Sequence, residues 1–347
     1  MKLTIFFPRN TFAGWASLGG YTQTLRRMGH EVIECVLPGN QPHDIVPLRA
    51  KLPTIEQLAA CDAVISFYHE YTQAWLMALY GLEAWAPLVN KTIARFDESM
   101  DRSDLNLPGR LPELLAWAKH WSFPAAQDAK KYGGKWQPFG ADTEMFKSRG
   151  AAGFPEQKKY DAAFVGQLYG PRLEYARRLA QQPEQITLQC GQVGVQELDG
   201  MREPESTQLL AQTYRQIKVF FCLPPLSRLI VGKVCEVMAC GTFVMYPRLP
   251  GDSAANLSAF EDGKHIVYYE HGYIRENVKQ IKRWLEHDKE RESIALAGCC
   301  KVREELSLEN MLDKLLTPIA RQMVTLESQP HKLFTPADEK LKVMSGF

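Results

Sequence analysis

The run from Gly232 to Tyr246 constrains the fold more than any other part of the sequence. It reads Gly-Lys-Val-Cys-Glu-Val-Met-Ala-Cys-Gly-Thr-Phe-Val-Met-Tyr and follows an apolar segment at 219–223. The apolar segment predicts a strand, Gly232 begins a helix, and Gly241 ends that helix in a left-handed cap. Residues 242–246 predict the next strand. Strand, helix and strand in this order form the repeating unit of a parallel sheet.

Two charged residues fall in the first turns of the expected helix. Lys233 and Glu236 lie three residues apart, so they share one helix face. The N-terminus of a helix offers N–H groups and the positive end of a dipole, which suit phosphate. A carboxylate one turn further along can accept hydrogen bonds from ribose hydroxyls. The pair predicts a nucleotide-sugar site in which Lys233 binds phosphate and Glu236 binds ribose.

The same run carries a family resemblance. Residues 233–242 resemble the basic-x-x-Glu-x-x-Ala-Cys-Gly-Thr signature of GT-B glycosyltransferases, in particular the CgeB-like or "glycosyl transferases group 1" family. Residues 261–269 resemble the segment that closes the donor pocket in that family. Residues 164–172 resemble the strand and glycine turn that open its donor domain. The C-terminal half resembles the family in sequence, and the N-terminal half resembles it in layout.

The resemblance implies an α/β chain with the GT-B fold, in which two Rossmann-like domains face each other across a cleft. The expected parts are an acceptor-side domain at 1–140, a donor domain at 141–318, and a helix and tail at 319–347 that return towards the first domain. The implied reaction moves a sugar from a nucleotide-diphosphate sugar, a UDP-hexose, to an acceptor hydroxyl. The family needs no obligatory metal, since a helix dipole and basic side chains neutralise the leaving diphosphate. No Asp-x-Asp metal motif is present.

Composition bounds the class of protein. A chain of 347 residues with a formal net charge of +1 fits two globular domains and argues against nucleic-acid binding through bulk charge. No apolar run approaches the length of a membrane span, and Pro8 and Arg9 interrupt the first apolar stretch too early for a signal peptide. The eight cysteines form no Cys-x-x-Cys pair, which indicates buried thiols in a reducing compartment. The expected location is the cytoplasm.

A glycine-containing loop follows the first expected strand, at 2–7. It contains Gly14, Gly19 and Gly20, and a helix is expected from 21 to 28. The Gly-x-Gly-x-x-Gly spacing of a dinucleotide site is absent. These glycines let backbone approach a ligand or simply make the turn, and the sequence leaves both interpretations open.

Two candidates for a catalytic base follow later strands of the N-terminal half. The expected strand at 62–67 leads to His69, and the one at 91–96 leads to Asp97. The carboxyl ends of parallel strands face the ligand crevice. A carboxylate or neutral imidazole there can deprotonate an acceptor hydroxyl, with Asp97 as first choice and His69 as second. The alternatives are a helix cap or ion pair for Asp97 and a packed histidine for His69.

The C-terminal half holds further candidates for donor contact, each next to an expected strand end or turn. They are Gly166, Arg172, Arg228, Gly232, Asp252 and Ser253. Surface charge and plain turn chemistry are the alternatives. Retaining relatives often carry a glutamate eight positions before the ribose glutamate, and here that position is Arg228. The stereochemical outcome is therefore open.

A linker pattern of the family, Pro-x-Gly-x-Asp-x-x-x-Phe, is also present. Pro138, Gly140, Asp142 and Phe146 occupy its positions, and the resemblance implies that the chain crosses between the domains there. The N-terminal half otherwise shows no specific motif. Residues 38–53 are polar and proline-rich, which predicts a loop.

Three other functions fit parts of this pattern. A nucleotide-sugar epimerase or hydrolase shares the fold and the ribose carboxylate, and a non-catalytic nucleotide-sugar-binding protein fits the missing glutamate. The acceptor is a small molecule, a glycan or, as in some phage enzymes of this fold, a modified DNA base. The basic clusters at 26–27, 130–131 and 147–149 could face DNA or be scattered surface charge.

Overall fold

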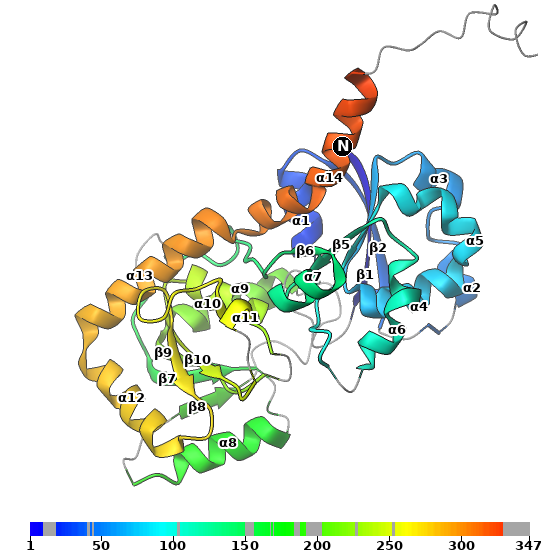
Figure 1. Ribbon diagram of the computed structural model, residues 1–347. Helices are drawn as coiled ribbons and strands as arrows, with labels where there is room; N and C mark the ends of the chain where they lie inside the picture. The colour runs from blue at the N-terminus through cyan, green and yellow to red at the C-terminus, as the bar shows by residue number, and fades with distance from the viewer. Residues whose placement is uncertain are drawn as a thin grey trace, which may run out of the picture. The chain divides into compact units, whose positions relative to one another are not determined.

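Two parallel sheets, one from each half of the chain, form the framework of the protein (Figure 1). The computed structural model describes residues 1–9, 19–39, 42–43, 45–102, 105–149, 156–166, 168, 170–183, 188–191, 203–225, 228–251 and 254–328. The chain divides into two units, Met1–Leu315 and Leu316–Phe347, and all the described strands belong to the first. This arrangement confirms the expected α/β class.

The N-terminal sheet is built from short apolar strands. They are β1 (Lys2–Arg9), β2 (Glu31–Pro38), β3 (Ala63–Ser66), β4 (Thr92–Arg95), β5 (His120–Phe123) and β6 (Lys135–Trp136). Their order is β2-β1-β3-β4-β5-β6, with parallel pairing throughout. Leu3 of β1 lies opposite Val32 of β2 and Ala63 of β3. The order reverses between β1 and β3, and ligands bind such sheets at the carboxyl ends beside that reversal.

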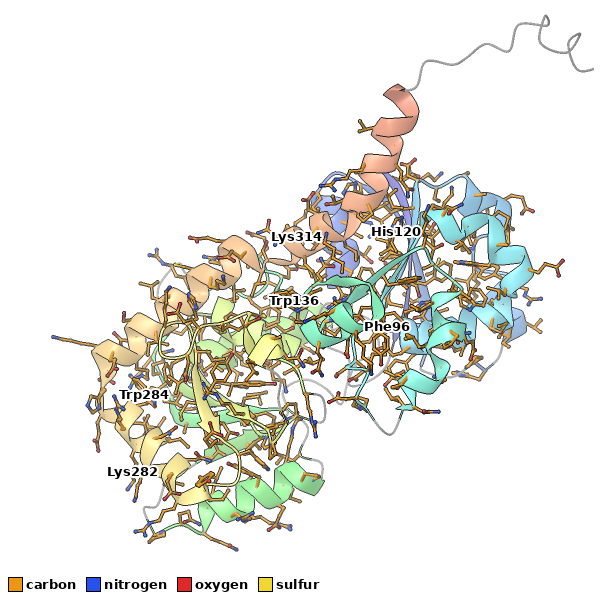
Figure 2. All side chains as sticks on the ribbon, viewed as in Figure 1. Phe96, His120, Trp136, Lys282, Trp284 and Lys314 are labelled. Carbon is orange, nitrogen blue, oxygen red and sulfur yellow. The ribbon has the colours of Figure 1, made fainter. Side chains whose placement is uncertain are left out.

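Helices connect these strands. They are α1 (Gly20–Arg27), α2 (Ile45–Arg49), α3 (Ile55–Ala59), α4 (His69–Leu79), α5 (Leu82–Trp85), the 3₁₀ helix η2 (Ala86–Lys91), α6 (Leu107–Leu115) and α7 (Ala126–Tyr132). The core beneath them is aromatic: Trp85 and Trp117 are fully buried and pack with ring centroids 5.6 Å apart. Phe96 stacks on Phe123 at 4.8 Å in the same half of the chain (Figure 2).

The structure corrects several local predictions in this half. The stretch 38–53, expected to be loop, contains α2. Helix α7 and strand β6 had no predicted counterpart. The physical reason is that α2, α7 and β6 are short, and such elements form through tertiary packing because their own sequence periodicity is weak.

The C-terminal sheet repeats the same topology. Its strands are β7 (Tyr160–Val165), β8 (Leu188–Gly191), β9 (Ile217–Phe221), β10 (Phe243–Arg248) and β11 (Val267–Glu270). Their order is β11-β10-β9-β7-β8, again with parallel pairing. The reversal falls between β7 and β9. Residues that follow β7 and β9 therefore border the expected ligand crevice of this sheet.

Seven helices of this half are described, and α10 is the one expected from Gly232. They are α8 (Gly170–Ala180), α9 (Glu203–Arg215), α10 (Gly232–Ala239), α11 (Ala254–Leu257), α12 (Ile274–Glu286), α13 (Asp288–Glu305) and α14 (Leu308–Ser328). Gly241, the expected left-handed residue after α10, has a φ of 72°. On α12, Trp284 packs on Phe243 of β10 with ring centroids 5.0 Å apart (Figure 2).

The linker pattern at 138–146 lies in sequence between the two sheets and is hydrogen-bonded to the segment between α13 and α14. The Ala141 N–H donates to Leu306 O at 3.0 Å, and the Leu308 N–H donates to Ala141 O at 2.7 Å. At Gly140 an added Cβ would lie 2.8 Å from Leu306 O, so a side chain would separate these segments. Asp142 Oδ1 accepts hydrogen bonds from backbone N–H groups of the turn that follows it. The Gly and Asp of the pattern thus have a backbone role here.

The eight cysteines are free thiols. Among the described helices, none combines enough length with enough apolar character to cross a membrane.

Gly298 of α13 gives a test of the packing behind α10. A Cβ at this position would lie 2.5 Å from His265 O and 2.6 Å from Met238 Cε, whereas nothing lies within 4 Å of a Cβ at Gly170. We expect Gly298→Ala to lower the free energy of unfolding by about 1–3 kcal/mol through overpacking. Gly170→Ala, the matched control at the start of α8, should leave it unchanged or raise it. Urea unfolding of both variants measures the difference, and equal stabilities would contradict the packing described.

Candidate functional site

Gly166 directly follows β7 at the reversal point of the C-terminal sheet. Its φ of 150° lies in a region that residues with a Cβ rarely adopt, and a Cβ there would lie 2.1 Å from Lys233 Nζ. Glycine therefore serves two purposes: it allows the turn and leaves room for the lysine. The structure thereby brings Gly166 and Lys233, both expected donor residues, into direct contact.

Two cations share one aromatic ring beside this glycine. Lys233 Nζ lies 4.8 Å from the centroid of the Phe164 ring, and Arg172 Cζ lies 5.2 Å from it. The Arg172 guanidinium is held by a hydrogen bond from Nε to Pro224 O, 3.1 Å long, after the end of β9. Arg172 and Lys233 come from different helices, so only the fold brings them together. The result is a concentrated positive charge at the sheet reversal.

The nearby guanidinium and the burial change the protonation equilibrium of the Lys233 amine. Burial, and then repulsion from Arg172, lower the pKa of Lys233 to about 8. An anion placed between the two cations would favour the protonated amine and raise that pKa again. Two cations placed this close together suit a negatively charged ligand.

Glu236 lies one turn further along α10 and keeps part of its surface in solvent. Burial raises the pKa of Glu236 to about 7, with Lys233 opposing the rise and Asp142 adding to it. A carboxylate so placed can accept hydrogen bonds from a polar ligand that extends past the cations. Val231, the N-cap of α10, makes no side-chain cap to the first-turn N–H groups. A helix end of this kind, with Lys233, Arg172 and Glu236, suits a diphosphate followed by a ribose.

Two other expected donor residues lie beside this cluster rather than in it. The side chain of Arg228 is about half exposed, and its Nε lies 3.5 Å from Asp101 Oδ2. Gly232 begins α10, where a Cβ would make an ordinary 3.5 Å contact with the Phe139 ring. Gly232 is therefore not required by space, and Arg228 is engaged by a carboxylate.

The remaining loop candidates divide in two. Gly14, Asp252 and Ser253 lie outside the described residues. Gly19, with a φ of 133°, is the N-cap of α1, and Gly20 is the first residue of that helix. Both glycines thus take part in the turn into α1, and their approach to a ligand stays a prediction.

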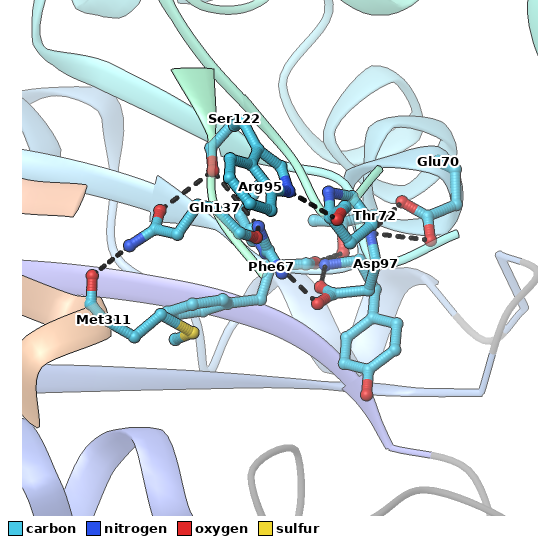
Figure 3. Close-up of polar contacts among 11 residues, drawn as sticks. Phe67, Glu70, Thr72, Arg95, Asp97, Ser122, Gln137 and Met311 are labelled. Atoms are coloured by element: carbon cyan, nitrogen blue, oxygen red, sulfur yellow. Dashed lines mark hydrogen bonds and ion pairs between the residues drawn. The ribbon is translucent and has the colours of Figure 1, made fainter. Parts of the chain in front are cut away.

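Asp97 lies enclosed at the end of β4. Its side chain has no exposed surface, Oδ1 lies 3.3 Å from Arg95 Nε, and Oδ2 accepts the Tyr68 N–H at 2.9 Å (Figure 3). Burial raises the pKa of Asp97, and Arg95 opposes that rise. The Asp97 N–H points at Glu70, whose buried carboxyl has a pKa well above its usual value. These contacts favour a positioning role for Asp97 over that of a base.

His69 is buried, and both nitrogens of its ring are hydrogen-bonded within the protein. One ring nitrogen bonds Ser66 Oγ at 2.8 Å and the other bonds Leu114 O at 2.9 Å. The residue has no exposed surface, and burial lowers its pKa to about 4. The packed-histidine alternative therefore describes its surroundings better than the role of base.

Sequence reasoning missed Phe164 and Tyr68. Both cations contact the ring of Phe164. The only local sequence signal for this role is an aromatic residue two positions before a turn glycine. Tyr68 adopts a left-handed conformation, with φ 48° and ψ 49°, which no residue pattern announces. Within the part of the chain that the structure describes, no group of three or more His, Cys, Asp or Glu residues could hold a metal ion.

The comparisons with known proteins agree with this arrangement. Residues 172–317 match a family model described as glycosyl transferase-like, and no curated protein matches the sequence. Anabaena HepE, solved in complex with UDP-glucose, is similar with a TM-score of 0.63 and 14% identity over 94% of this chain and 100% of that chain. An α-glucosyltransferase solved with UDP and a 13-mer DNA has a TM-score of 0.63 and 12% identity over 92% and 100% of the two chains.

A glycosyltransferase from Rickettsia africae ESF-5 is also similar, with a TM-score of 0.60 and 12% identity over 93% of this chain and 98% of that chain. Identities this low show the shared fold, while the family match covers the segment that holds Arg172, Lys233 and Glu236. The narrower CgeB-like assignment stays a prediction. The chain therefore has the fold of these GT-B glycosyltransferases, and its residues 172–317 match the glycosyl transferase-like family model.

Proposed function

We propose that the chain transfers a hexose from a UDP-hexose to an acceptor hydroxyl, with no obligatory metal. The observation that carries the proposal is the pair of cations, Lys233 and Arg172, on the Phe164 ring at the sheet reversal. UDP-glucose and UDP are the ligands named for the Anabaena protein and for the α-glucosyltransferase. The free thiols support a reducing compartment, the cytoplasm.

The donor would bind with its diphosphate between Lys233, Arg172 and the start of α10. As the bond from the sugar to the diphosphate breaks, negative charge grows on the leaving oxygen. Cations already fixed in place stabilise that charge without reorganisation. Glu236 would accept hydrogen bonds from the ribose, and Gly166 would let the backbone approach the diphosphate. This set of residues can neutralise the leaving group by itself.

Arg228 would contact the donor diphosphate only after it leaves its ion pair with Asp101. Its 3.5 Å ion pair with Asp101 joins two partly exposed side chains, and such pairs are weak. A bound diphosphate would compete with Asp101 for the guanidinium. Arg228 would then add to the charge at the leaving group once the donor is bound.

A carbohydrate or small-molecule acceptor is favoured over DNA. Arg27, in one of the basic clusters, is engaged by Asp142 at 2.9 Å and Glu309 at 2.8 Å. Lys147, in another, pairs with Glu144 at 2.8 Å. Cations neutralised by their own chain contribute little to a DNA-binding surface.

Glu236 provides the first test of the donor site. We expect Glu236→Ala to weaken UDP binding about 10- to 100-fold, since it removes hydrogen bonds to a charged acceptor. Glu174→Ala, which replaces an exposed glutamate on α8, should bind UDP as the wild type does. Isothermal titration calorimetry gives the affinities, and thermal melting shows that both variants are folded. UDP-glucose consumption with and without EDTA measures turnover. Wild-type protein that binds neither UDP nor UDP-glucose would overturn the proposal.

The pH dependence of donor binding tests the same residues. Glu236, with a pKa of about 7, gains a proton below that pH, and Lys233 loses its charge above a pKa of about 8. UDP-glucose affinity should therefore be highest between pH 7 and 8 and fall on either side, by up to about tenfold per pH unit. In Lys233→Arg the alkaline decrease should disappear, since a guanidinium keeps its charge. A flat profile from pH 6 to 9 in the wild type would contradict the assignment of these two groups.

A further inference from the structure

The backbone of Tyr68 is held in an unfavourable conformation. With φ 48° and ψ 49° it is one of two non-glycine residues with positive φ in the described part of the chain, the other being Asn106. Asparagine tolerates this region, whereas a bulky aromatic residue there is an outlier that the surrounding structure must impose. Glycine would adopt the same backbone conformation without strain.

The residues on both sides fix the backbone of Tyr68. Phe67 stacks on Tyr21 with ring centroids 3.8 Å apart, and His69 is bound through both ring nitrogens. Asp97 Oδ2 accepts the Tyr68 N–H at 2.9 Å, and Thr72 Oγ1 donates to Phe67 O at 2.7 Å (Figure 3). The left-handed turn is therefore held by a buried aromatic stack and a buried carboxylate.

That carboxylate is itself fixed. Arg95 and Asp97 both have side chains without exposed surface, and the Asp97 N–H lies 3.3 Å from each carboxyl oxygen of Glu70. The side chains of Arg95, Asp97 and Glu70, three ionisable groups, are thus buried near Tyr68. Burying such groups is unfavourable unless they are paired. An arrangement of this kind is expected where a backbone conformation has a use.

The use concerns the Tyr68 side chain. The structure describes all of residues 63–70. Within this stretch Tyr68 is partly exposed to solvent, and the other seven residues are buried. It follows β3 at the reversal between β1 and β3, where the ligand crevice of this sheet is expected. The strained turn therefore places an aromatic ring, instead of a bare glycine, at the crevice of the N-terminal sheet.

We propose that Tyr68 is a specificity-determining residue for the acceptor, which is a carbohydrate, and that Asp97 positions it. This inference rests on the proposed function. The phenol ring offers an apolar face for the C–H face of a sugar and a hydroxyl that can bond a sugar hydroxyl. Asp97 acts through the Tyr68 backbone and touches neither reacting atom.

The variant Tyr68→Gly distinguishes the role of the side chain from the cost of the backbone strain, because it removes both. The variant should melt at or above the wild-type temperature, because glycine relieves the positive φ. With UDP-glucose as donor and p-nitrophenyl glycosides of glucose, galactose and N-acetylglucosamine as probes, its KM for the glycoside should rise at least tenfold. Its Kd for UDP should change less than twofold. Tyr68→Phe should raise the KM less than Tyr68→Gly does, and Asp97→Asn should also raise it with UDP binding kept.

Asn106→Gly is the matched control, since it removes the other positive-φ side chain at φ 45°. It should change neither KM nor Kd. A Tyr68→Gly variant with an unchanged glycoside KM, or one that loses UDP affinity as much as glycoside affinity, would overturn the inference.

Saturation-transfer NMR measures glycoside binding without any donor. Failure of the wild type to bind UDP would overturn the proposed donor site. Loss of glycoside binding in Tyr68→Gly would support the role of Tyr68 even then. No binding or transfer with any glycoside, in a protein that binds UDP-glucose, would overturn the carbohydrate class.

Discussion

The buried ion pair between Arg95 and Asp97 is the interaction on which much of this structure depends. Neither side chain has exposed surface. Arg95 Nη1 also donates to Gln137 O at 2.5 Å and to Ser122 Oγ at 3.2 Å, and its Cζ lies 5.3 Å from the centroid of the Phe139 ring. Removing one partner of such a pair typically costs ~3–5 kcal/mol, because the other charge is left buried. One guanidinium thus holds both the end of β4 and the start of the linker.

The linker pattern at 138–146 connects the pair to α10. The Phe139 ring, which Arg95 contacts on one side, lies against Gly232 at the start of α10. Gln137 Nε2 donates to Met311 O in α14 (Figure 3). The N–H that Asp97 accepts from Tyr68 and the helix that carries Lys233 are therefore supported by neighbouring residues of one linker. Precise support of this kind is what a site assembled from separate elements requires.

The sequence was informative where the chemistry is local. The helix that carries Lys233 and Glu236 on one face was predicted from its local sequence, and so was the left-handed Gly241 after its end. Their contact with a donor stays a prediction. Phe164 could not be found, since its role comes from two cations on different helices that only the fold brings together. The same holds for Asp97 and His69: a strand end predicted their place, but burial and partners, which decide their chemistry, arise from tertiary packing. The helix start at His69 follows from the left-handed Tyr68, for which there is no residue signal.

The two sheet reversals differ in how well their charges are satisfied. At the N-terminal one, Asp97 faces Arg95 and a backbone N–H, and burial raises the pKa of Glu70 well above its usual value. At the C-terminal one, Lys233 shares a ring with a second cation and its pKa falls to about 8. The first arrangement is stable without a ligand and suits a fixed surface. In the second, an anion placed beside the two cations would favour the protonated amine of Lys233 and raise its pKa again.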